Sequence, residues 1–261
     1  MPDVISFDGV RLSVHVLGAG EPVTVMGHGL TSTYRDFEIF APFLPGTKVM
    51  FDFRGHGDSE CPPPGSYTTE HFAQDLASVA KEYEATCAAG VSLGVAAIMR
   101  ILATDPDRFD RLVLLLPGRV PPPQAVKDRL FHLADLLEWH SVEATAEIIL
   151  AEEEADGAFE AFPAAKEFRR DGLLRMNRAG IPNAIRECID DPPITDPDLV
   201  RQAHAPTLLI AQENDLLHDA DIAREMASLL PNSELHVFPD QFALLRDVPT
   251  LVQRSAAFLS G

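Results

Sequence analysis

Cysteines, basic residues and long apolar runs are all scarce in this sequence. Its three cysteines, at positions 61, 87 and 188, are too few and too scattered for a disulfide framework. The opening MPDVISFDGV lacks the basic and apolar segments of a signal peptide, and no apolar run reaches the length of a membrane span. Against 21 Lys and Arg stand 40 Asp and Glu, a formal net charge of −19. Such a surface repels phosphate backbones and anionic lipids, so we expect a cytoplasmic protein that binds neither nucleic acid nor membrane.

Motifs for metals and nucleotides are missing as well. The sequence has no H-E-x-x-H pattern and no Cys/His cluster with zinc-ligand spacing. It also has neither a G-x-x-x-x-G-K-[ST] loop nor a G-x-G-x-x-G turn after a strand. We therefore predict no metal and no cofactor, and we expect the partner to be a small-molecule substrate. The oligomeric state is left open.

Short apolar runs alternate with longer amphipathic stretches along most of the chain. This alternation indicates an α/β protein whose mostly parallel sheet is covered by helices on both faces. A hairpin is expected over Val4–Val16, with its turn at Asp8-Gly9. Further strands are expected at Val23–Met26, Lys48–Phe53, Thr86–Ala89, Leu112–Leu116, Thr207–Ala211 and Glu234–Phe238, and helices at Arg35–Leu44, Thr69–Glu84, Leu93–Thr104, Ala220–Leu230 and Thr250–Leu259.

Residues 119–203 break this alternation, because they show helical patterns and no convincing strand. Pro121-Pro122-Pro123 opens the region, and Asp190–Pro197, with three prolines, closes it. The segment is far longer than an ordinary loop. We interpret it as a helical cap inserted into a core formed by residues 1–118 and 204–261.

One motif carries chemistry. Gly90-Val91-Ser92-Leu93-Gly94 lies between a predicted strand and a predicted helix, the setting of a nucleophile elbow. Its glycines allow close backbone approach, and the helix that starts there directs free N–H groups at developing negative charge. Gly27-His28-Gly29-Leu30 follows another strand, where a second donor would converge on the same point. We predict Ser92 as nucleophile and the amides of Leu30 and Leu93 as the oxyanion hole.

With these motifs the chain resembles the α/β-hydrolase family, particularly its small esterase, lactonase and C–C hydrolase members. Asp52-Phe53-Arg54-Gly55-His56-Gly57-Asp58-Ser59 and Asn214-Asp215 add to the resemblance, in the family's order. The resemblance implies an eight-stranded, mostly parallel sheet with a cap after the sixth strand. It also implies a catalytic acid after the seventh strand, at Asp215, with Glu213 as the near rival.

The family's histidine, which follows the last strand, is missing. Phe242 stands at that position, yet a serine hydroxyl needs a base within hydrogen-bond reach at neutral pH. His218 and His140 are the leading candidates for a relocated base, although His218 would also fit as a residue capping or lining the next helix. His28 flanks the oxyanion turn and is expected to be a scaffold or pocket residue. Without a histidine partner, a buried Asp215 should have a raised pKa.

A small basic island also stands out in this acidic chain. Arg169-Arg170, Arg175 and Arg178 would form a solvated helix face or meet a carboxylate on a substrate or partner.

Three functions remain open from the sequence. The first is a hydrolase that acts on a small apolar ester, lactone or thioester through Ser92, with an incomplete or rearranged triad. The second is a lyase, cyclase or isomerase that uses the pocket and oxyanion hole without serine acylation. The third is a non-catalytic ligand-binding protein on a hydrolase scaffold. A strained elbow favours an enzyme, because a pure binder has no chemical need of it.

Overall fold

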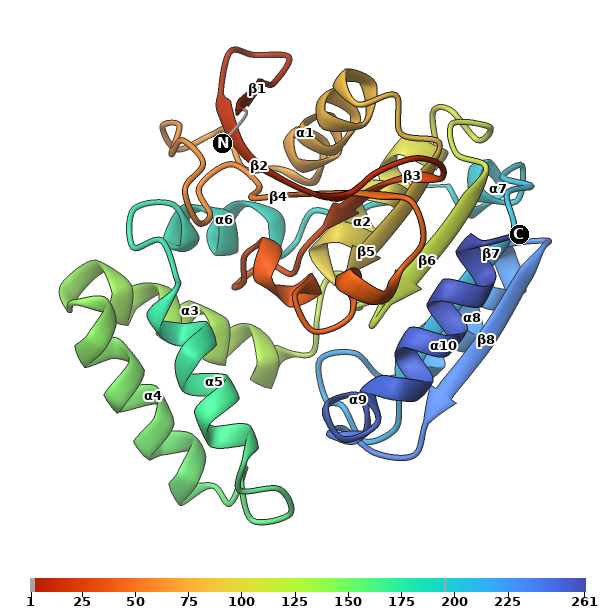
Figure 1. Cartoon of the computed structure of the whole chain (residues 1–261). Coiled ribbons are helices and arrows are strands. Elements are labelled where there is room, and N and C mark those ends of the chain that lie inside the picture. The colour runs from red at the N-terminus through yellow and green to blue at the C-terminus, as the bar shows by residue number, and fades with distance from the viewer. Residues whose placement is uncertain (1–2, 195) are drawn as a thin grey trace.

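The computed structural model describes residues 3–194 and 196–261 and contains one eight-stranded sheet (Figure 1). The strand order is β1-β2-β4-β3-β5-β6-β7-β8. β2 pairs antiparallel with β1 and β4, and every other pair is parallel. The predicted eight-stranded, mostly parallel sheet is therefore confirmed. The strands are β1 Asp3–Ile5, β2 Arg11–Gly18, β3 Val23–Gly27, β4 Thr47–Phe51, β5 Cys87–Val91, β6 Arg111–Leu115, β7 Thr207–Gln212 and β8 Ser233–Phe238.

Helices cover both faces of the sheet, as predicted. Successive residues of a strand point to opposite faces, so Ala88 of β5 packs into the core beneath α1 and α2. Its neighbours Cys87 and Ala89 pack into the other core, which α9 and α10 cover. These helices, with α8 beside β7 and β8, are α1 Thr69–Glu82, α2 Leu93–Leu102, α8 Ala220–Leu229, α9 Ala243–Arg246 and α10 Val248–Leu259.

The helix expected over Arg35–Leu44 was wrong. Two short 3-10 helices occupy this stretch, η1 at Tyr34–Phe37 and η2 at Ala41–Phe43. Pro42 gives the reason, because it lacks the N–H that a continuous α-helix would need at that position.

The described helices between β6 and β7 form the predicted insertion. In Figure 1, α3, α4 and α5 stand together away from the sheet. They share a small core of their own with α6, which includes Leu133, Leu137, Ile149, Leu173 and Ile185. The division into a core and a separate cap domain stays a prediction. The inserted helices are α3 Gln124–Trp139, α4 Val142–Ala155, α5 Ala165–Leu174, α6 Ile181–Cys188 and α7 Pro197–Val200.

Within residues 3–194 and 196–261, every helix is too short or too polar to span a bilayer.

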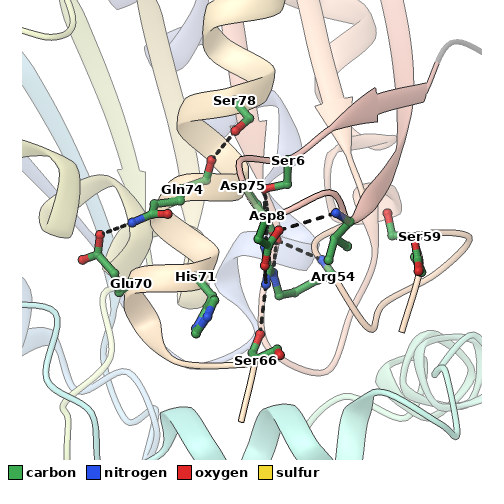
Figure 2. Close-up of polar contacts among 12 residues, drawn as sticks. Ser6, Asp8, Arg54, Ser59, Ser66, Glu70, His71, Gln74, Asp75 and Ser78 are labelled. Carbon is green, nitrogen blue, oxygen red and sulfur yellow. Dashed lines mark hydrogen bonds and ion pairs between the residues drawn. The ribbon is translucent and has the colours of Figure 1, made fainter. Parts of the chain in front are cut away.

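A buried ion-pair network fixes the loop after β4 (Figure 2). The fully buried Arg54 donates from Nε to Asp75 Oδ2 at 2.9 Å and from Nη2 to Asp75 Oδ1 at 2.7 Å. Its Nη1 donates to Asp8 Oδ2 at 2.7 Å. A buried guanidinium requires such partners, so the loop is held against both α1 and the N-terminal hairpin. Two residues on, His56 Nε2 donates to Leu30 O at 2.5 Å, which links this network to the loop after β3.

Candidate active site

Ser92 lies on a strained turn between β5 and α2. Its φ of 50° and ψ of −101° fall in a region that non-glycine residues rarely adopt. The neighbouring backbone is too close for side chains at the flanking glycines. A Cβ on Gly94 would lie 1.8 Å from Gly27 O, and one on Gly90 would lie 2.6 Å from the carbonyl carbon of Gly94. The strand, sharp turn and helix thus occur where the G-x-S-x-G pattern places them.

Two backbone amides beside Ser92 have no protein acceptor within the described ranges, those of Leu30 and Leu93. Leu93 is the first residue of α2, and a first-turn N–H has no partner inside its own helix. The loops that carry the two amides are tied together, because Gly94 N–H donates to His28 O at 3.0 Å. Both leucines line the cavity that contains Ser92. Both N–H groups are therefore unused by the described residues of the protein.

His218 links Ser92 to Asp215. Its Nε2 lies 3.0 Å from Ser92 Oγ, and its Nδ1 lies 3.2 Å from Asp215 Oδ2. A carboxylate only accepts, so Nδ1–H donates to Asp215, and in that tautomer Nε2 can accept the Ser92 proton. The structure therefore brings three predicted residues into one chain of hydrogen bonds. It also places His218 on the β7–α8 loop that carries the acid.

Asp215 uses both of its carboxylate oxygens. Oδ1 accepts from the backbone N–H groups of Leu217 and His218, each at 3.0 Å, and Oδ2 also accepts from Gln212 Nε2 at 2.9 Å. Burial alone would raise the pKa of Asp215, but the hydrogen bonds and charge of His218 and the bond from Gln212 outweigh it and lower the pKa. The expectation of an unpartnered carboxylate with a raised pKa was wrong, because His218 is its partner.

A cavity of about 250 Å³ opens at Ser92 and His218. Its walls come from α2, the segment after β6, and the inserted helices, and most of the side chains are apolar. Such a chamber suits a small apolar group. The apolar walls include Val95, Met99, Val120, Leu130, Ile189 and Met226.

The other histidine candidates lie elsewhere. His28 is buried, and both of its ring nitrogens are hydrogen-bonded to backbone groups. Nδ1 donates to Gly29 O at 2.8 Å, and Nε2 accepts from Phe53 N–H at 3.0 Å. Burial and the neighbouring His56 lower the pKa of His28, which keeps the ring neutral. His140 ends α3 on the exposed surface and is not part of the cavity wall.

Phe242 lies at the start of α9, outside the wall of the Ser92 cavity. Its ring centroid is 5.8 Å from that of Phe162, which belongs to the inserted segment. The side chain at the expected histidine position thus contacts the insertion.

Asp36 is the residue of this site that sequence analysis missed. Its carboxylate lines the cavity, accepts from Gly29 N–H at 3.0 Å and pairs with the Ser32 hydroxyl. Burial raises its pKa, while bonds from Ser32 and Gly29 act in the opposite direction. An aspartate in a 3-10 turn carries no sequence signal for this contact, which depends on how η1 folds back onto the loop after β3.

Solved structures with the same architecture include three hydrolytic enzymes. An esterase from Thermogutta terrifontis, with malate bound, has a TM-score of 0.81 and 21% identity over 99% of this chain and 97% of that one. The enol-lactonase from Burkholderia xenovorans LB400 has a TM-score of 0.82 and 19% identity over the whole of both chains. A carboxylesterase structure from Nitrososphaera gargenis has a TM-score of 0.83 and 18% identity over 99% of each. At these identities the likeness establishes the fold.

Sequence comparison with curated proteins finds no match. Residues 24–241, however, match the alpha/beta hydrolase family, a range that runs from β3 past β8 and includes the elbow and the β7–α8 loop. With this match and the strand order above, the chain belongs to the alpha/beta hydrolase family.

Proposed function

We propose that this protein is a serine hydrolase that cleaves a small, apolar ester, lactone or thioester with Ser92, His218 and Asp215 as its triad. The observation that carries the proposal is the 3.0 Å contact between His218 Nε2 and Ser92 Oγ. Because a serine hydroxyl needs a base within hydrogen-bond reach, this contact supports an activated Ser92 although no histidine follows β8 in the sequence.

In the proposed reaction, Ser92 Oγ attacks the substrate carbonyl carbon while its proton passes to His218 Nε2. Asp215 stabilises the imidazolium, and the Leu30 and Leu93 amides donate to the oxyanion. The tetrahedral intermediate collapses, the carbonyl–oxygen or carbonyl–sulfur bond breaks, and the leaving group takes the proton from His218. Water then attacks the acyl-serine, with His218 again accepting and returning the proton.

The size and lining of the cavity support the substrate class. A chamber of about 250 Å³ with apolar walls admits a short acyl or aryl group and offers little to a polar one. Structural neighbours are named as an esterase and an enol-lactonase, which supports an ester or a lactone as the substrate. A lyase or isomerase would use the same oxyanion donors but would not form an acyl-serine, so acylation separates these functions.

Labelling with a fluorophosphonate probe tests the proposal. We expect the wild-type chain to be labelled and to hydrolyse 4-nitrophenyl butanoate, and both signals to vanish in a Ser92→Ala variant. A folded wild-type protein that neither reacts with the probe nor releases 4-nitrophenol would contradict the proposal. Probe labelling that persists in the Ser92→Ala variant would assign the reactive group to another residue.

A further inference from the structure

Beneath the inserted helices lies a second cavity, of about 190 Å³, that is lined by three arginines. Arg35 comes from η1, Arg169 from α5 and Arg175 from the end of α5. The remaining lining residues are Thr31, Ser32, Thr33 and Asp36 of the segment after β3 and Phe168 and Gly172 of α5. Among its described lining residues, these three guanidinium groups face a single carboxylate, that of Asp36. Each of the three arginines also pairs with an acid outside the lining, namely Glu38, Glu153 and Asp171.

The structure divides the basic island of the sequence into two parts. Arg169 and Arg175 line the cavity, whereas the others hold the insertion together. Arg170 pairs with Glu147 on α4, and Arg178 donates from Nε to Leu137 O at 2.7 Å, at the end of α3. Arg35, which lies far away in sequence, joins the first pair.

The guanidinium groups in the cavity keep free donors. Arg169 binds Glu153 through Nε and Nη2, at 3.1 and 2.8 Å, which fixes the side chain and leaves Nη1 without a partner in the described part of the chain. Arg175 contacts Asp171 at 3.4 Å, and Arg35 contacts Glu38 at 2.9 Å, both on an exposed surface. Such exposed pairs contribute little and yield readily to a better-placed anion.

This cavity adjoins the chamber of the candidate active site. Thr31, Ser32 and Asp36 contribute to the walls of both. A substrate whose carbonyl lies at Ser92 would have to extend past these residues to contact the arginines. The chain that joins the reacting carbonyl to the group bound by the arginines must match the span between the two cavities. The length of that chain is therefore a useful experimental variable.

We propose that the cavity formed by Arg35, Arg169 and Arg175 binds a carboxylate at the far end of a substrate that is apolar near Ser92, so that the preferred substrates are esters or lactones of dicarboxylic acids. This inference rests on the proposed function. Guanidinium groups bind carboxylates through charge-assisted hydrogen bonds. A singly charged carboxylate fits better than a doubly charged phosphate, because Asp36 and the acids paired with the arginines repel the second charge.

Paired 4-nitrophenyl esters test the inference. One series ends in a carboxylate, from succinate to suberate, and the other ends in a methyl group at the same chain length. At one or more lengths we expect kcat/KM for the acid to exceed that of its neutral partner by about tenfold to hundredfold, the range for hydrogen bonds to charged groups. This ratio should fall at least about tenfold in Arg175→Gln and Arg169→Gln, mainly through KM. The matched control is Arg170→Gln, on the same helix but outside the cavity, which should keep the ratio.

The two proposals fail in different ways. If the neutral esters are hydrolysed through Ser92 but the carboxylate gives no advantage at any length, the carboxylate subsite is overturned and the proposed function stands. An advantage that survives in both Arg169→Gln and Arg175→Gln would overturn it too. If neither series is hydrolysed, calorimetry decides on the subsite alone. Tighter binding of the acid that Arg175→Gln abolishes would support it, and equal binding of acid and neutral ester would overturn it.

Discussion

Replacing His218 by alanine should abolish most activity while leaving the fold intact. The substitution removes the imidazole, whose Nε2 lies 3.0 Å from Ser92 Oγ. Within the described ranges, this is the only side-chain hydrogen bond to that oxygen. Loss of the base from such a triad lowers kcat by about 10⁴-fold to 10⁶-fold, or about 5 to 8 kcal/mol at about 1.36 kcal/mol per tenfold change. The oxyanion donors and the cavity remain, so KM should change little.

The stability cost should be much smaller than the catalytic one. Asp215 keeps its bonds to Gln212 and to the backbone when the imidazole is removed. Loss of the remaining hydrogen bond predicts a decrease of about 1 to 3 kcal/mol in the free energy of unfolding. Urea titration checks this value, and 4-nitrophenyl butanoate hydrolysis gives kcat and KM separately. His140→Ala is the matched control, because that histidine is exposed at the end of α3 and should leave both constants unchanged.

Returning a histidine to the position after β8 should not rescue the His218→Ala variant. The Phe242 ring lies against Phe162 and outside the Ser92 cavity, so a Phe242→His side chain would start from the wrong place. A His218→Ala variant that retains more than about a tenth of the wild-type kcat would contradict the role of His218 as the base. Recovery of the lost rate by Phe242→His would contradict it equally.

Three further predictions concern Asp215, the buried ion pair of Arg54, and the glycine after the Ser92 turn. Asp215→Asn should lower kcat about 10⁴-fold with little change in KM. The folded pKa of Asp215 lies below its unfolded value, so the carboxylate stabilises the fold above about pH 4 and loses this effect as the pH falls. In urea titrations from pH 6 to pH 3, the free energy of unfolding should therefore decline less in Asp215→Asn than in the wild-type protein. Arg54→Met leaves Asp75 buried without its partner and should destabilise the fold by about 3 to 5 kcal/mol, measured by urea unfolding. Gly94→Ala should abolish fluorophosphonate labelling and lower Tm, because its Cβ would lie 1.8 Å from Gly27 O.

Local sequence patterns were sufficient to predict most of the sheet and the nucleophile turn. The strand before Ser92, the glycines around it and the helix after it are all encoded within a few residues, so the pattern and the geometry agree. The proposed acid, Asp215, was expected from the family resemblance, which implies an acid in the loop after the seventh strand. The helix over Arg35–Leu44 failed because helical periodicity did not outweigh the missing N–H of Pro42.

The base and the arginine cavity depend on contacts that no local pattern contains. His218 and Ser92 are 126 residues apart, on the loops after β7 and β5, with β6 between these strands. Spacing along the chain made His218 a candidate but did not fix the direction of its ring. Arg35 likewise meets Arg169 only because α5 folds over η1. Prediction from sequence weakened wherever function required segments distant in the chain to meet.

The proposed acid and base lie on a single loop, and this changes what the rest of the fold must supply. Asp215 Oδ1 binds the backbone N–H of His218 while Oδ2 binds its ring, so one carboxylate fixes both the main chain and the side chain of the histidine. Only one long-range contact, from His218 to Ser92, then remains to be aligned, where a histidine after β8 would need two. The segment after β8 therefore carries no demand for a base, and in this protein its Phe242 packs against Phe162 of the insertion. Substitutions there should alter how the inserted helices sit over the cavity, and hence KM, before they alter the chemical step.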